Sequence, residues 1–279
     1  MKAPVLLLAI LLCISGFSQG YNRKNKDAFP QQPRYEKKFW YFDLGGNYTL
    51  PLVNKKEIDG TVVADTLYRT QLFQKGKVGA YLEFGRYHII NKYYFFRYWN
   101  YGLSYSLLKG SETYKHQLII ANNPIELMTG ENTFSDHYLG MHVELNGRNK
   151  LTDNTFVSHG FGLNASYAII SKRTYTHSVQ GIEEKTQSKI HGYLYYKLGW
   201  GIRANKKLLV IPTIEVPIMN LYSWNGARAD IPYFKSNYWP LTFSVRFILC
   251  QPYRQKSCPP VDAIGVPEGY NEDGSKKSK

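Results

Sequence analysis

The sequence predicts an all-β fold: an eight-stranded antiparallel transmembrane β-barrel, built as an up-and-down meander with a filled lumen. The main observation is the segment Phe156–Ile170, where apolar side chains alternate with small or polar ones. Successive strand side chains point to opposite faces, so this segment has one apolar and one polar face. It is also long. Strands of membrane barrels need about nine to eleven tilted residues, whereas ordinary strands have about five or six.

Composition and the start of the chain support this fold class. The chain has 24 Tyr, 14 Phe and 5 Trp among 279 residues, and these residue types favour strands. Residues 1–18 predict a secretory signal peptide, with Lys2, the apolar run Val5–Ile14 and small residues before Gln19. No later segment has the roughly 18 apolar residues of a membrane helix. An exported chain of this kind crosses a membrane as a barrel or leaves it.

The repeats of the alternating pattern divide the chain. We expect a signal peptide at 1–18, a basic periplasmic linker at 19–38, an outer-membrane β-barrel at 39–250 and a disordered periplasmic tail at 251–279. The predicted strands are Phe39–Leu50, Val78–His88, Tyr94–Leu107, Asp136–Asn146, Phe156–Ile170, Ile190–Arg203, Leu208–Met219 and Asn237–Leu249. Long and short connections alternate between them, as in outer-membrane barrels, which places both termini in the periplasm.

The longest connections are predicted to be polar loops, at Pro51–Lys77 and Leu108–Ser135. Within the second, the apolar run Leu118–Ile120 either extends a strand or packs over the barrel mouth. The connections Ser171–Ser188 and Asn220–Ser236 are also interpreted as loops.

Charged residues test which face points into the lumen. Arg or Lys on the lipid face at mid-membrane costs about 2–4 kcal/mol. The mid-strand charges all fall on the polar face, and we expect a lumen charge network of Asp43, Glu83, Glu144, Lys197, Glu215 and Arg246. We expect Glu144 to meet Lys197, and Glu83, Glu215 and Arg246 to form a second cluster. Two interpretations stay open: a salt-bridge network that fills the barrel, or an ion-conducting path. The alternative fold is a soluble lipocalin-type barrel, whose apolar face points inward.

The signal peptide, the eight two-faced strands and the four long connections resemble the small outer-membrane barrels of OmpA/OmpX type. The Gln that follows the signal peptide, the Tyr-rich strands and a last strand ending Phe247-Ile248-Leu249 are similar to outer-membrane β-barrel families of Bacteroidota. The resemblance covers about Phe39–Cys250 and implies a barrel without a catalytic motif. It departs from OmpA after Cys250, where only a short tail follows.

Other candidate sites lie at the ends of the barrel. Cys250 and Cys258 are close enough in sequence to form a disulfide in an oxidising compartment. The connection before the last strand carries aromatic and Arg residues, which are typical interface anchors. It either binds a partner or packs on itself as a cap. The residues concerned are Tyr222, Trp224, Arg228, Tyr233 and Phe234.

We expect no catalytic, cofactor-binding or metal site. His142 and His191 share the lumen face but lack a recognisable ligand spacing. Barrel lipid A deacylases use a His-x-Ser motif, which is absent here, and Ser158 and His159 point to opposite faces. The formal charge of +14 fits contact with anionic lipid headgroups. Nucleic acid is not expected, because the chain is exported.

The predicted function is therefore non-enzymatic: an outer-membrane barrel that contacts outer-membrane lipids and serves as a structural or accessory subunit of an envelope complex, for secretion or barrel assembly. Its expected partners are other outer-membrane or periplasmic proteins. One alternative is a surface adhesin or ligand-binding barrel that acts through its loops. The other is a lipid A-modifying enzyme.

Overall fold

The computed structural model describes residues 38–53, 55–63, 66–90, 96–120, 123–152, 154–176, 187–205, 207–222 and 228–250. The predicted signal peptide, nearly all of the linker, and the tail lie outside these ranges, so those domain boundaries stay predictions. The strands are β1 (Lys38–Pro51), β2 (Lys55–Val63), β3 (Thr66–Ile89), β4 (Tyr98–Ile120), β5 (Asn123–Lys150), β6 (Thr155–Tyr175), β7 (Ile190–Arg203), β8 (Leu208–Asn220), β9 (Ile231–Tyr233) and β10 (Ser236–Leu249).

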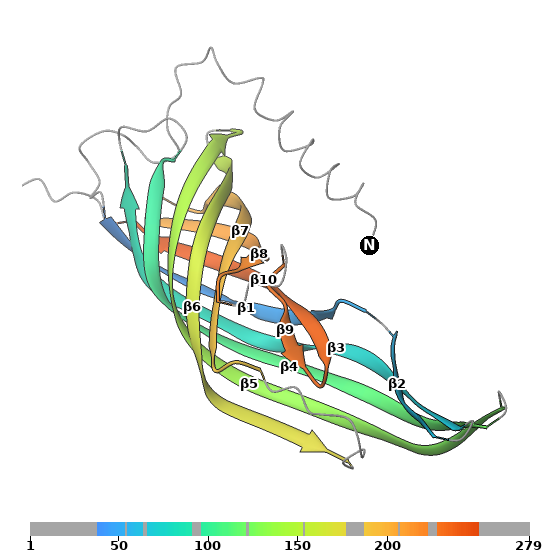
Figure 1. Cartoon of the computed structure of the whole chain (residues 1–279). Coiled ribbons are helices and arrows are strands. Elements are labelled where there is room, and N and C mark those ends of the chain that lie inside the picture. Colours follow the sequence, from blue (N-terminus) through green and yellow to red (C-terminus); the bar gives the residue numbers. More distant parts are fainter. Residues whose placement is uncertain are drawn as a thin grey trace, which may run out of the picture.

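Eight of these strands close into a ring (Figure 1). β1 pairs with β10 on one side and with β3 on the other, and every pairing in the ring is antiparallel. The order around the ring is β1, β10, β8, β7, β6, β5, β4 and β3. The predicted antiparallel up-and-down barrel is confirmed. The described residues form ten strands rather than eight, because β2 and β9 lie within connections that were predicted to be loops.

The apolar face of the barrel points outward. Along β1, Leu44 is exposed while Asp43 and Asn47 are buried, and the other ring strands repeat this alternation. A soluble barrel of lipocalin type would have the opposite arrangement. We call the exposed apolar surface around the ring the belt; it includes Leu44, Leu82, Phe84, Leu103, Met141, Val143, Phe161, Leu163, Leu198, Trp200, Ile214 and Phe243.

Four strands continue well past the belt. β3, β4, β5 and β6 have 24, 23, 28 and 21 residues, and with β2 they form a sheet that extends from one end of the ring (Figure 1). We call this sheet the wing: β2, residues 66–77 of β3, 109–120 of β4, 123–135 of β5 and 171–175 of β6. The loops predicted at Pro51–Lys77 and Leu108–Ser135 are therefore wrong over most of their length. Beyond the belt, the alternation of exposed apolar and buried polar side chains that marks the other strands is absent.

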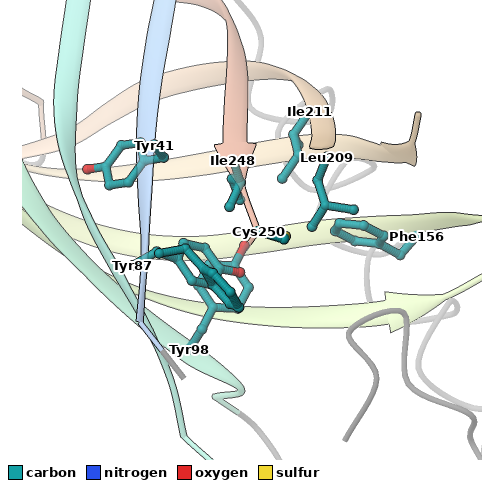
Figure 2. Close-up of a cluster of buried hydrophobic side chains, with 9 residues drawn as sticks. Tyr41, Tyr87, Tyr98, Phe156, Leu209, Ile211, Ile248 and Cys250 are labelled. Carbon is teal, nitrogen blue, oxygen red and sulfur yellow. The ribbon is translucent and has the colours of Figure 1, made fainter. Parts of the chain in front are cut away.

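Two clusters of buried side chains close the lumen. One lies at the end where β1 begins and β10 ends, which we call the short-turn end, and it holds Phe39, Tyr41, Tyr87, Tyr98, Phe156, Leu209, Ile211, Ile248 and Cys250 (Figure 2). The other lies toward the wing and holds Leu108, Phe134, Tyr138, Ala168, Ile231, Tyr233, Phe234 and Tyr238. None of the described residues belongs to a helix long and apolar enough to span a membrane.

Candidate functional site

The charged residues of the lumen come from six different strands. On each strand, the charged residue lies next to a residue that faces outward. Successive side chains of a strand point to opposite faces, so the charged side chain points toward the barrel axis. The structure brings all six predicted residues into one cluster between the two apolar clusters. Exposed fractions of 3% or less are found for Asp43, Glu83, Glu144, Lys197, Glu215 and Arg246.

Arg246 on β10 forms the densest part of the cluster. Its Nε donates to both carboxylate oxygens of Asp43, at 3.2 and 3.1 Å. Its two terminal nitrogens donate to Glu144, each at 3.2 Å, and Nη2 also donates to Glu83 at 2.9 Å. The rigid guanidinium fork can serve several carboxylates at once, which an ammonium group does less well.

Lys197 on β7 completes the cluster. Its Nζ lies 3.1 Å from Glu83 Oε2, 3.2 Å from Glu215 Oε2 and 3.7 Å from Glu144 Oε2. Glu144 and Lys197 do meet, but Glu83 contacts both cations and Glu215 contacts Lys197 rather than Arg246. The expectation of two separate clusters was therefore wrong: the lumen is narrow enough for one network to span it.

Residues outside the predicted set belong to the same network. His142 Nε2 lies 3.0 Å from Glu83 Oε1 and 2.6 Å from the Tyr41 hydroxyl. Tyr195 donates to Glu144 Oε2 and Tyr193 to Glu215 Oε1, each at 3.3 Å. These His and Tyr residues alternate with outward-facing residues in the same way as the charged residues do. That sequence pattern could have identified them as lumen residues. Four carboxylates face two permanent cations here, so these added donors help to offset the excess negative charge.

Small residues on β6 make room for this network. A Cβ at Gly162 would lie 2.2 Å from Cζ of Tyr195, whose hydroxyl holds Glu144. Asn164 on the same face donates to Ser104 Oγ at 3.2 Å. The small inner face of β6 therefore leaves the lumen width that the Tyr ring needs.

The wing end of the lumen is covered by the β9–β10 hairpin, which we call the cap. Tyr233 stacks on Phe134 with ring centroids 3.7 Å apart, and Phe234 packs against Phe134 and Tyr175. Tyr233 and Phe234 were candidate partner-binding residues, but both side chains are buried and point inward. This agrees with the alternative interpretation, in which the connection packs on itself as a cap. Of the other candidates, Tyr222 and Arg228 are exposed, and Trp224 lies outside the described residues.

Glu112 on β4 anchors the cap to the wing. It lies beyond the belt, buried under the cap, and accepts a hydrogen bond from Ser236 Oγ. Nearby, Lys56 Nζ on β2 donates to the backbone oxygen of Lys235 at 2.7 Å. Burial raises the pKa of the Glu112 carboxyl to about 7, and the Ser236 hydrogen bond and the charge of Lys56 oppose that shift. The cap thus rests on a carboxyl group that titrates near neutral pH.

The remaining candidate residues lie apart from one another. Cys250 is buried in the cluster at the short-turn end, whereas Cys258 lies outside the described residues, so the disulfide stays a prediction. Ser158 points into the lumen and bonds the Tyr98 hydroxyl, while its neighbour His159 has the outward parity. Within the described ranges, no three His, Cys, Asp or Glu side chains are grouped so as to hold a metal ion.

Comparison with known proteins gives structural similarity only. No family model and no curated protein matches the sequence. Two solved structures resemble the fold. One is the outer membrane protein OprG from Pseudomonas aeruginosa, 10% identical over 77% of this chain and 97% of that one, with a TM-score of 0.37. The other is the outer membrane protease OmpT from Escherichia coli, 7% identical over 80% and 99% of the two chains, with a TM-score of 0.35. At these values the function does not transfer.

Proposed function

We propose that this chain is an integral outer-membrane barrel with a sealed lumen, which acts as a non-enzymatic accessory subunit of an envelope assembly. The belt supports the membrane placement. Large apolar side chains such as Phe84, Leu103, Met141 and Trp200 are each about half exposed or more on the outer face. Monomeric soluble proteins rarely expose contiguous apolar surface on this scale, whereas a membrane barrel needs it.

The sealed lumen is the observation that carries the non-conducting, non-enzymatic part of the proposal. An eight-stranded ring is just wide enough for side chains to fill it. Here an aromatic cluster, a charge network and the cap follow one another along the axis. Both cations are paired with several carboxylates, and Tyr193 and Tyr195 donate further hydrogen bonds to the acidic groups. This pairing favours a structural role over a path for ions or a substrate cavity.

The wing is the surface through which we expect the subunit to act. Its tip exposes four apolar side chains on the face that carries the cap, and we call them the wing patch: Tyr68, Ile120, Ile125 and Met128. Apolar side chains rimmed by polar ones commonly mark protein-binding surfaces. The first residues of β1 and the last residues of β10 lie at the short-turn end. We assign this end to the periplasm, so the wing and its patch lie on the cell surface.

Co-purification in mild detergent tests this function. We expect the wild-type chain to retain companion envelope proteins and a variant with Ile120→Ser and Ile125→Ser to lose them. The matched control replaces Gln117 and Glu126, a pair on the other face of the same hairpin, by Ser. A wild-type barrel that runs alone as a monomer would sink the accessory-subunit proposal. The same experiment without Pro259–Lys279 asks whether the tail contributes.

An adhesin is the second candidate, and the exposed wing patch favours it too. It predicts that intact cells displaying the wild-type protein bind an external protein or surface, and that the same Ser variant abolishes this binding. In that case the purified barrel is free of envelope companions, which separates the two functions. A planar-bilayer conductance above that of a plugged barrel would contradict the sealed lumen in either case.

A further inference from the structure

Lysine side chains mark the edge of the belt on three of the four neighbouring strands β3 to β6 of the wing. Lys77 precedes the exposed Val78 on β3, Lys109 follows Leu107 on β4, and Lys172 follows Ile170 on β6. Cross-strand pairing places these positions in one row: Lys77 opposes Lys109, Lys109 opposes Ser135 of β5, and Ser135 opposes Lys172. The next row outward contains Lys75 opposite Ser111. We call Lys75, Lys77, Lys109 and Lys172 the lysine rim.

The rim belongs to the outer face of the sheet. On β4 the odd-numbered residues Trp99, Tyr101 and Leu103 face outward, and the pairing with β5 keeps one register from there through Lys109. The even-numbered Gly110 and Glu112 are buried on the cap side. Register partners share a face, so Lys77 and Lys172 lie on the outer face with Lys109.

Charges in the rim are poorly balanced by the protein. Within these two rows the described residues of β3 to β6 contain four lysines and no carboxylate; the other members are Ser111, Thr133, Ser135 and Thr174. The nearest acid on this face is Glu131, one row farther out, whose Oε1 lies 3.7 Å from Lys77 Nζ. Like charges directly opposite across two strands are destabilising, as Lys77 and Lys109 are. The arrangement suits an anion from outside the chain.

The belt identifies the source of that anion. A lipid whose acyl chains contact Val78, Leu107 and Ile170 has its headgroup just beyond these side chains. The outward-facing residues at that level of the same strands are Lys77, Lys109 and Lys172. Ammonium groups bind phosphate as point charges, and the hydroxyl of the half-buried Ser135 can donate a further hydrogen bond. We propose that the lysine rim binds the phosphate groups of anionic lipid headgroups in the leaflet around the barrel. This inference rests on the proposed membrane placement.

Native mass spectrometry of the full chain tests the rim with phosphatidylglycerol as the probe. The barrel is inserted into phosphatidylcholine vesicles containing a minority of phosphatidylglycerol, released into neutral detergent, and scored for retained lipid. The test variant is Lys109→Gln with Lys172→Gln. The control is Lys55→Gln with Lys115→Gln, which removes the same charge from rows of the wing farther from the belt. Each lysine near a membrane surface is worth about 1 kcal/mol, so the test variant should retain the anionic lipid about tenfold less well or worse.

The outcomes separate cleanly. Lipid binding by the lysine rim is supported if the wild-type chain and the control variant retain phosphatidylglycerol and the test variant loses it. Equal retention in the two variants overturns it, and so does displacement of the lipid by inorganic phosphate alone, which would assign the lysines to a free anion. Insertion is read separately by heat-modifiable gel mobility in pure phosphatidylcholine vesicles. A wild-type chain that fails to insert there contradicts the membrane placement and the rim with it, whereas insertion without anionic-lipid retention overturns only the rim.

Discussion

Arg246 on the last strand and Asp43 on the first strand are cross-strand partners, and the guanidinium donates to both oxygens of the carboxylate. This ion pair spans the seam where the ring closes. Because Arg246 also holds Glu83 and Glu144, one side chain links β1, β3, β5 and β10. Closure of the barrel and satisfaction of its buried charges therefore depend on the same residue.

Replacement of Arg246 by Met should destabilise the barrel strongly. The change leaves Asp43, Glu83 and Glu144 buried with Lys197 as the remaining permanent cation, and loss of one partner of a buried ion pair costs about 3–5 kcal/mol. Urea unfolding in detergent, followed by intrinsic fluorescence, measures the loss. Arg246→Lys keeps the positive charge but lacks the several donors of the guanidinium group. The stability of this variant should therefore fall between those of the wild-type and Met chains. A Met variant with the wild-type midpoint would contradict a stabilising network.

Gly162→Leu should prevent folding, whereas Leu163→Val should not. A side chain at Gly162 enters the lumen where the ring of Tyr195 lies, because even a Cβ there would be 2.2 Å from the ring. Leu163 is exposed on the belt, and Val remains apolar there. Heat-modifiable gel mobility reports the folded barrel for both. If Gly162→Leu kept that mobility, the narrow lumen at β6 would not be needed for folding.

The cap should dock more firmly at acid pH than at alkaline pH. Burial raises the pKa of Glu112 to about 7, so the folded state favours the neutral acid. A carboxyl with a raised pKa contributes stability that is present below its ordinary value and lost as pH rises through the raised one. Cap docking should weaken from about pH 5 to pH 8, measured by hydrogen exchange of Ile231–Tyr233.

Glu112→Gln provides the control for this pH dependence. The amide keeps an oxygen for the Ser236 hydroxyl but does not ionise, so exchange in the cap should lose its dependence on pH across the same window. The same pH profile in the Gln variant would assign the effect to another group.

Lys235→Gly should stabilise the cap. Phe234 and Lys235 form the two-residue turn of the hairpin with φ of 46° and 62°, a left-handed conformation that costs a non-glycine residue about 1–2 kcal/mol. The contact from Lys56 uses the backbone oxygen of Lys235, which glycine retains. The greater freedom of glycine in the unfolded chain offsets about 0.4–1 kcal/mol of that gain. Hydrogen exchange in β9 should slow, and faster exchange would contradict this account of the turn.

The faces of the ring strands could be read from the sequence alone. From Trp40 to Leu249, each strand that crosses the belt alternates apolar with small or polar residues, and every charge of the network was placed inside on that basis. The physical reason is the period of two along a strand together with the cost of a charge in lipid. These two constraints act locally, so no knowledge of neighbouring strands is required.

The tertiary structure alone decided which of those charges meet. Asp43 and Arg246 are 203 residues apart in the chain, and their contact depends on the register of eight strands around a closed ring. It also decided that most of the predicted loops Pro51–Lys77 and Leu108–Ser135 are strands of a wing, and that Tyr233 and Phe234 fold inward as a cap. Beyond the belt, cross-strand hydrogen bonds and packing between distant segments specify the structure, and neither leaves a periodic pattern in the sequence.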